Sequence, residues 1–94
     1  MKVKKLEKKI WDVEGFSIII CHPDGSNVHG AMEVAQPYPY QNAGWNDWTI
    51  AHWRENRFLK NLPQFTVKVL DGDGNVVEHG LTRLGTVRDS YEEE

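Results

Sequence analysis

Apolar residues are densest between positions 10 and 21, where the run ends at a turn sequence. β-branched and aromatic side chains predominate in this stretch, as is typical of a strand. They are Ile10, Trp11, Val13, Phe16, Ile18, Ile19 and Ile20. Because three successive isoleucines point alternately to both faces of a sheet, the pattern predicts a strand that is covered on both sides, with Gly15 at a bulge.

A turn and a long loop follow this strand. Residues 22–25 have proline at the second position and glycine at the fourth, which suits a type I turn between antiparallel strands. Residues 26–34 are therefore expected to return as a weaker strand. Positions 35–44 are expected to form an extended loop, because the residues before Pro37 and Pro39 are pushed away from helical angles.

A helix is predicted over residues 50–62. Asn46, Asp47 and Thr49 can all cap its start, and neither glycine nor proline occurs before Pro63. At 100° per residue the apolar side chains gather on one side of this helix. They are Trp48, Ala51, Phe58, Leu59 and Leu62. Ile50 and Trp53 lie off that arc, which predicts contacts on two sides of the helix.

The rest of the pattern indicates short strands. Apolar residues alternate with polar ones over 65–69, residues 71–75 form a tight turn, and residues 76–79 are expected to pair back as a hairpin arm. Residues 81–87 supply one more short strand. The order of elements predicts an α+β fold, with a small antiparallel sheet of about four to five strands and one main helix packed on one face.

Length and composition predict one folded unit over residues 1–94. The chain has 94 residues, of which 39% are hydrophobic and 27% charged, as in an ordinary globular domain. Lysines are concentrated at one end and carboxylates at the other, and terminal blocks of like charge are usually solvated. We therefore expect a frayed basic N-terminal arm (1–9) and an acidic C-terminal tail (89–94).

Charge and hydropathy limit the classes of partner. A net charge of −3 argues against nucleic acid as a partner. A lysine arm that grips phosphate or anionic lipid is the alternative, but the five lysines have no interleaved arginine or aromatic residue, which disfavours it. No apolar stretch approaches the roughly 20 residues that cross a bilayer, so no membrane partner is expected. A lone cysteine, Cys21, and a start without an apolar signal segment favour a cytoplasmic protein.

No cofactor or metal is expected. Asp71, Asp73 and Asn75 match the first, third and fifth positions of an EF-hand calcium loop, but Val76 and Thr82 stand at the sixth and twelfth. A hairpin turn explains the same residues. The four histidines have no zinc-ligand spacing.

The aromatic segment at residues 38–53 is the least ordinary part of the chain. It interleaves rings with prolines and amides, a composition that suits stacking on flat ligands, sugars or proline-rich peptides, and also an oligomer interface. The candidate site residues are Tyr38, Tyr40, Trp45, Trp48 and His52. A second interpretation is that these rings only cover a small core.

From this segment we predict a non-catalytic binding or interaction module, whose partner is a small molecule, another protein or, most simply, a second copy of the chain. Trp53 and Phe58 are expected to be structural, and Trp45 at least partly exposed at an interface.

The alternative is a small enzyme with a carboxylate or histidine in a cleft beside the same aromatics: Glu55, His52 or His29. Glu55 projects within the predicted apolar arc, unless that face is narrower and Glu55 pairs with Arg54 or Arg57 at its edge. Adjacent residues of a strand point to opposite faces, so Cys21 and His22 are not expected to form a catalytic pair, and Cys21 is expected to be buried and inert.

Three short segments carry a resemblance to a known group of proteins. They are Thr49-Ile50-Ala51-His52-Trp53, Leu70-Asp71-Gly72-Asp73-Gly74 and Leu84-Gly85-Thr86-Val87-Arg88-Asp89-Ser90-Tyr91. With these segments the chain resembles small uncharacterised bacterial proteins encoded on integron mobile gene cassettes, over about its C-terminal half. The resemblance implies a bacterial cytoplasmic protein and brings no activity and no functional residue with it.

Overall fold

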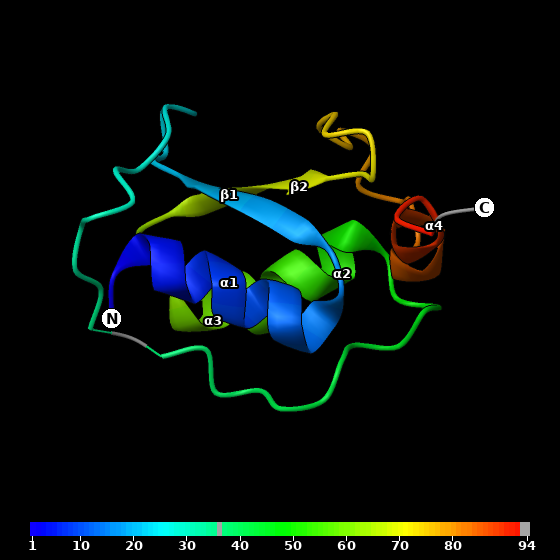
Figure 1. Ribbon diagram of the computed structural model, residues 1–94, viewed down its shortest axis with the longest axis horizontal. Coiled ribbons are helices and arrows are strands. Elements are labelled where there is room, and N and C mark those ends of the chain that lie inside the picture. Colours follow the sequence, from blue (N-terminus) through cyan, green and yellow to red (C-terminus); the bar gives the residue numbers. More distant parts are fainter. Residues whose placement is uncertain (36, 93–94) are drawn as a thin grey trace.

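The computed structural model describes residues 1–35 and 37–92. Its elements, in chain order, are α1 (Val3–Glu14), β1 (Ser17–Cys21), α2 (Ile50–Trp53), a π-helical turn (Arg54–Phe58), α3 (Leu59–Asn61), β2 (Thr66–Leu70) and α4 (Leu84–Asp89). The sheet lies over α1 and the continuous α2–α3 helix, and α4 lies at one end (Figure 1). The backbone has a radius of gyration of 12.5 Å, close to the value of about 12 Å expected for a folded chain of this length.

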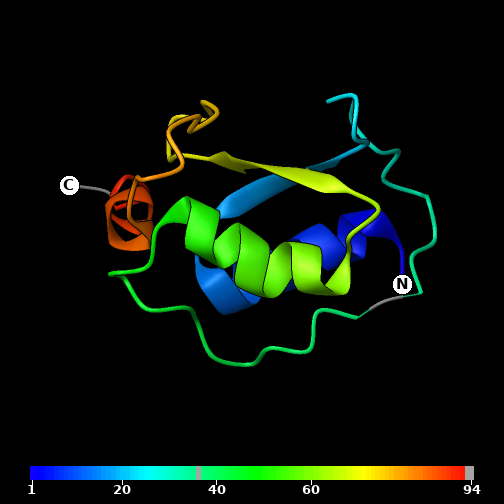
Figure 2. The ribbon, with the colours of Figure 1, turned by 180° about the vertical axis from the view of Figure 1, so that it is seen from behind.

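The α+β class is confirmed, but the predicted number of strands is wrong. Two antiparallel strands, β1 and β2, form the sheet in the described part of the chain. Two long helices, rather than one main helix, cover the same face of that sheet, as the view from behind also shows (Figure 2).

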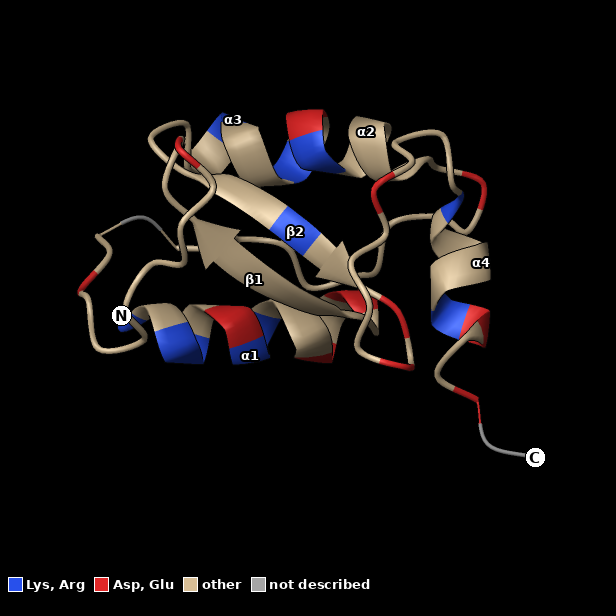
Figure 3. Ribbon diagram, turned by 90° about the horizontal axis from the view of Figure 1, so that it is seen from above, with Lys and Arg blue, Asp and Glu red and all other residues tan. Residues whose placement is uncertain are grey.

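The lysine-rich N-terminus is a helix, not a frayed arm. Val3, Leu6 and Ile10 are fully buried, and their spacing of three and four residues places them on one helical face. The lysines of α1 lie on the remaining faces (Figure 3). The strand predicted from position 10 therefore begins only at residue 17, after Gly15 has ended α1 in a left-handed conformation with φ 79°.

The sheet buries one face. Ile18 lies opposite Val69 and Ile20 opposite Val67, and all four side chains are buried against the helices. Ile19 points the other way and is only half-buried, so the predicted cover on both faces is incomplete.

At the first residue pair of the sheet, Ser17 and Leu70, a side chain takes part in the hydrogen bonding between the two strands. The backbone N–H of Ser17 donates to the hydroxyl of Tyr91 at 3.0 Å, and that hydroxyl donates to the carbonyl oxygen of Leu70. Ser17 and Leu70 are paired in the register, so the hydroxyl lies between them. Tyr91 follows α4, and it therefore ties the C-terminal helix to the sheet.

The predicted turns are confirmed, whereas the strands predicted beyond them are not. The N–H of Gly25 donates to the carbonyl of His22 at 2.9 Å, and that of Gly74 to the carbonyl of Asp71 at 3.0 Å. Residues 26–34 and 76–79 make only isolated bridges, such as the one between Leu70 and Val76. These segments lack the run of paired residues that a strand requires.

The strand predicted at 81–87 is wrong, because α4 forms there instead. Leu84 and Val87 are buried and lie three residues apart, the spacing of one helical face. The predicted acidic tail overlaps this helix, which ends at Asp89, and Glu92 is exposed. Residues 93 and 94 of that tail lie outside the described residues.

The helix predicted over 50–62 is confirmed, but the direction of its buried side chains shifts at one point. Its cap is Thr49, whose hydroxyl accepts from the N–H of His52 at 3.1 Å. The fully buried positions are Ile50, Trp53, Phe58 and Leu62, spaced by three, five and four residues. The spacing of five spans the π-helical turn, where one extra residue rotates all later side chains relative to earlier ones. A single α-helical wheel therefore misplaced Ile50 and Trp53.

The buried side chains form one hydrophobic cluster around Trp53. The ring of Trp53 lies 5.1 Å from Phe16 and 6.1 Å from Phe58, centroid to centroid. Trp53 and Phe58 are fully buried, as predicted. No helix in the described ranges is long and apolar enough to span a bilayer.

Candidate functional site

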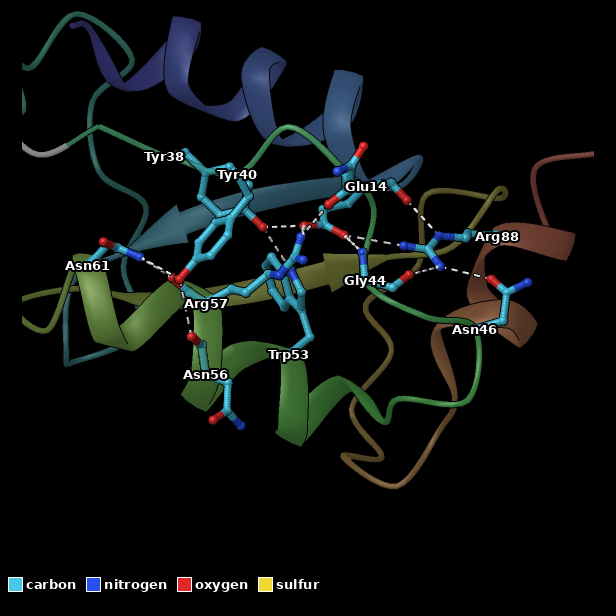
Figure 4. Close-up of polar contacts among 11 residues, drawn as sticks. Glu14, Tyr38, Tyr40, Gly44, Asn46, Trp53, Asn56, Arg57, Asn61 and Arg88 are labelled. Carbon is cyan, nitrogen blue, oxygen red and sulfur yellow. Dashed lines mark hydrogen bonds and ion pairs between the residues drawn. The ribbon is translucent and has the colours of Figure 1, made fainter.

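A buried carboxylate at the end of α1 organises the aromatic segment. Glu14 is 1% exposed, and four groups donate hydrogen bonds to its two oxygens (Figure 4). Oε2 accepts from the hydroxyl of Tyr38 and from Nη1 of Arg57 at 2.7 Å. Oε1 accepts from the backbone N–H of Gly44 at 2.7 Å and from Nη2 of Arg88 at 3.2 Å. The four donors come from the long loop, the π-helical turn and α4, so Glu14 joins parts of the chain that are far apart in sequence.

Arg88 fixes the loop from the other side. Its Nε donates to the backbone oxygen of Glu14 at 2.6 Å. Its Nη1 donates to the backbone oxygen of Gly44 at 2.7 Å and to Oδ1 of Asn46 at 2.8 Å. The residues on either side of Trp45 are therefore both held by the same guanidinium group.

Tyr38 belongs to the core rather than to a surface site. It is 3% exposed; its hydroxyl donates to Glu14 and accepts from Nε1 of Trp53 at 3.0 Å. Burial and the neighbouring Glu14 carboxylate raise the pKa of Tyr38 well above its ordinary value. For this residue, the second interpretation of the aromatic segment, as cover for the core, is correct.

Tyr40, Trp48 and His52 form a row with an arginine. The guanidinium carbon of Arg57 lies 4.4 Å from the ring centroid of Tyr40 and 5.1 Å from that of Trp48, within the range of cation–π interactions. The rings of Trp48 and His52 are 4.8 Å apart. Tyr40 and Trp48 are half-buried, and His52 is exposed. The structure thus brings these three predicted site residues together around Arg57.

Burial acts on the pKa of both Arg57 and Arg88, but the net shift has the opposite direction in the two residues. Burial disfavours the charge of Arg57, but its hydrogen bond and ion pair with Glu14 outweigh this, so the pKa of Arg57 lies above its ordinary value. For Arg88, burial dominates and lowers the pKa, with Glu14 opposing it. Both guanidinium groups remain charged at neutral pH, because arginine is not deprotonated in proteins.

Trp45 is the exposed member of the aromatic segment, with 74% of its surface accessible to solvent. This agrees with the prediction that it is at least partly exposed. Its backbone oxygen accepts from the N–H of Trp48 at 3.0 Å. Together with the bonds to Gly44 and Asn46, this holds the main chain around Trp45 in one conformation while its ring lies in solvent.

The residues of the enzyme alternative lie on the surface. Glu55, His52 and His29 are all exposed, and no hydrogen bond or ion pair among residues 1–35 and 37–92 joins any two of them. Glu55 lies in the π-helical turn, whose extra residue takes it off the core face, while Arg57 pairs with Glu14. Glu14 itself already accepts four hydrogen bonds, which fill the lone pairs that a general base would need.

Cys21 is buried, as predicted, and its thiol lies 3.6 Å from the backbone oxygen of Ile19. Burial raises the pKa of Cys21, which disfavours the reactive thiolate. The neighbouring His22 ring faces Phe65 at 6.2 Å.

In the turn at residues 71–75, which partly matches a calcium loop, the first carboxylate accepts hydrogen bonds from the backbone of the turn itself. Oδ1 of Asp71 accepts from the N–H of Asp73 at 2.9 Å and from that of Asn75 at 3.0 Å. No cluster of His, Cys, Asp or Glu suited to a metal ion occurs in residues 1–35 and 37–92.

Sequence reasoning missed the residues that position this site: Glu14, Gly44, Asn46, Arg57 and Arg88. One signal was present. Glu14 lies four residues after Ile10 and so continues the apolar helical face of α1, where an isolated carboxylate requires partners. Nothing in the local spacing identifies those partners, because they lie in distant segments.

No protein-family model matches the chain, and comparisons with curated proteins and with solved structures give no match either. The assignment of a function therefore rests on the geometry described above.

Proposed function

We propose that the protein is a non-catalytic interaction module that associates with a second copy of itself through Trp45. The observation that carries this proposal is the combination of an exposed ring and a fixed backbone: Trp45 is 74% exposed, while Gly44 and Asn46 on either side are held by Arg88. An indole buries on the order of 200 Å² on association. Because the loop is already ordered, little conformational entropy is lost when the ring docks.

The surface around Trp45 is built from two segments that lie side by side. The N–H of Gly85 donates to the carbonyl of Asn46 at 3.1 Å, and that of Ile50 to the carbonyl of Thr82 at 2.9 Å. Leu81 lies in the second segment and is 71% exposed. Tryptophan is among the residues that most often anchor interfaces, and its exposed ring on ordered main chain suits that role.

The charges in these segments suit a two-fold interface. Asp47 and Arg83 are 3.9 Å apart and their side chains are 88% and 67% exposed, so the pair contributes little within one copy. In an isologous dimer, each surface meets the same surface of the other copy. We infer that Asp47 of one copy pairs with Arg83 of the other at the rim around Trp45.

Light scattering and sedimentation over a range up to millimolar protein test the proposal. We expect wild-type protein to reach the mass of a dimer and Trp45→Ala to remain a monomer with unchanged circular dichroism. Trp11→Ala is the matched control, because Trp11 is also an exposed tryptophan, at 40%, but lies on α1. Wild-type protein that is monomeric throughout, or an equal loss of dimer in both variants, contradicts the proposal.

A charge exchange tests the rim separately. Asp47→Arg places like charges across the proposed interface and should weaken the dimer about ten-fold. The double variant Asp47→Arg with Arg83→Asp restores opposite charges and should recover most of the affinity. Failure of the double variant to recover would contradict the two-fold pairing.

A further inference from the structure

One edge of the sheet is open at a single residue. The carbonyl of Val69 accepts from the N–H of Val77 at 2.8 Å, so the main-chain groups of Val69 point away from β1. Ile18 is paired opposite Val69, and its own N–H and carbonyl therefore point to the outer edge of β1. Among the described residues, none donates to or accepts from Ile18 on that edge.

Two residues further on, the same edge is occupied. The N–H of Ile20 donates to Oε2 of Glu7 at 2.9 Å, and its carbonyl accepts from the N–H of Val28 at 3.0 Å. Glu7 and Val28 thus take the places that a third strand would fill at Ile20. An incoming strand can pair with β1 at Ile18 and has to end or turn away at Ile20.

A groove of about 260 Å³ lies next to this open position. It is lined by Glu7, Lys8, Trp11, Ser17 and Ile18, and runs between α1 and the outer edge of β1, which lie side by side in Figure 3. Its volume is below the 300–1,000 Å³ typical of sites for drug-sized ligands. The groove is large enough for one amino-acid side chain.

The groups on the wall of the groove select the kind of side chain. Oε1 of Glu7 accepts from no described residue, and burial raises the pKa of the Glu7 carboxyl, with the hydrogen bond from the N–H of Ile20 opposing it. The ammonium of Lys8 lies 3.2 Å from Asp12 and is paired there. Trp11 is 40% exposed, with its ring edge-to-face on Tyr91 at 5.2 Å. A carboxylate beside an exposed indole matches a cation with an apolar stem.

We propose that this groove binds an extended peptide segment of another protein, which pairs with the main chain of Ile18 and places a lysine or arginine side chain between Glu7 and Trp11. The main-chain pair supplies affinity for any extended segment, and the groove selects the side chain, as in other cases of strand addition to a sheet edge. This site is separate from Trp45, and it does not depend on the proposed self-association.

A second copy of the chain is a poorer occupant. Two β1 strands paired about Ile18 would each continue to Ile20, where Glu7 and Val28 already occupy the edge. β1 is fixed against its own α1 and cannot turn away, whereas a flexible peptide can. The observations therefore favour a peptide from a different protein.

The test uses blocked heptapeptides of alternating valine and threonine, with lysine, norleucine or glutamate at the central position. Amide chemical shifts in ¹⁵N-labelled protein report where each peptide binds. We expect the lysine peptide to shift the resonances of Ile18 and the indole of Trp11 saturably, with the norleucine and glutamate peptides at least about ten-fold weaker, because a charge-assisted hydrogen bond is lost. Methylation of the central amide nitrogen should abolish binding by removing the main-chain donor.

Three variants make the result specific. Glu7→Gln keeps an acceptor for the N–H of Ile20 and should reduce affinity for the lysine peptide about ten-fold while leaving the norleucine peptide unchanged. Trp11→Ala should weaken both peptides. Trp45→Ala, the matched tryptophan control, should bind as wild type does, which separates this site from the proposed dimer interface.

Several outcomes would overturn the proposal. They are the absence of shifts at Ile18 with any peptide, equal binding of the lysine and glutamate peptides, and equal effects of Trp11→Ala and Trp45→Ala. Shifts at Ile18 that depend on protein concentration without peptide would instead assign the edge to a second copy.

Discussion

Nη1 of Arg57 lies 2.7 Å from Oε2 of Glu14, a residue 43 positions earlier in the chain, and this ion pair joins the π-helical turn to the end of α1. The Glu14 side chain is fully buried and that of Arg57 is 14% exposed. Removing two charges from water offsets most of their attraction, so the pair adds little net stability compared with an apolar pair. The role of this ion pair is to fix the position of the Glu14 carboxylate, which also accepts from the N–H of Gly44, the residue before Trp45.

Glu14→Gln should destabilise the fold by about 3–5 kcal/mol, because it leaves the guanidinium groups of Arg57 and Arg88 without their counter-charge in a buried site. Urea unfolding followed by circular dichroism measures this change. Asp12→Asn is the control on the same helix: its carboxylate is exposed and pairs with Lys8, and its loss should change stability by less than about 1 kcal/mol. Equal effects of the two substitutions would show that Glu14 does not hold the structure.

Stability should fall as pH rises above about 10, and Tyr38 should cause part of that fall. The pKa of Tyr38 is raised in the folded state by burial and by Glu14, whereas in the unfolded chain it is near 10. The folded state therefore keeps the proton longer, and the stabilisation is complete below the unfolded pKa and lost above it. Tyrosinate absorbance should show Tyr38 ionising only on unfolding. In Tyr38→Phe this step should disappear; its persistence would contradict the assignment.

Trp53→Ala and Phe58→Ala should each destabilise the protein by about 3–5 kcal/mol, since both side chains are fully buried in the one hydrophobic cluster. This is a large share of the 5–15 kcal/mol typical of a domain, so little folded protein is expected. Trp45→Ala should unfold at the wild-type midpoint in dilute solution, where the proposed dimer dissociates. The yield of folded protein and the thermal midpoint distinguish these results. A Trp45→Ala variant as unstable as Trp53→Ala would contradict the claim that Trp53 stabilises the core and Trp45 does not.

Gly72→Ala should destabilise the fold by about 1–3 kcal/mol, because its added methyl group would overlap the carbonyl of Ser90 at the end of α4. The N–H of Gly72 donates to Oγ of that serine at 2.8 Å, so the two segments cannot separate without losing this bond. Gly30→Ala is the matched control, since its methyl group would lie 3.5 Å from Cβ of Lys4, an ordinary contact. The difference in urea midpoint between the two variants measures the effect, and no difference would show that α4 moves away freely.

Features specified by neighbouring residues could be predicted from the sequence. Thr49 as a cap, the turn at residues 71–75 and the exposure of Trp45 all follow from local chemistry, and the structure contains them. α1 could also have been found, because Val3, Leu6 and Ile10 have helical spacing. The high density of β-branched residues that follows was instead assigned to one long strand.

Other features depend on contacts between distant segments and have no local signal. The spacing of five between Trp53 and Phe58 reflects a π-helical turn, which a uniform helical period cannot reveal. Tyr38 is buried with its hydroxyl donating to Glu14, a residue 24 positions earlier, whereas Trp45 is exposed. A residue-by-residue reading of the aromatic segment therefore could not separate its core members from its surface members.

The hydroxyl of Tyr91 between Ser17 and Leu70 has a consequence for how the molecule opens. The amide proton of Ser17 is bonded to a side chain that follows α4, so it can exchange with solvent only when that side chain withdraws or the strands part. Its exchange rate thus reports the docking of the C-terminal helix and that of the sheet at once. We therefore expect α4 and the β1–β2 pair to open together, although the two bonded groups lie 74 positions apart in the chain.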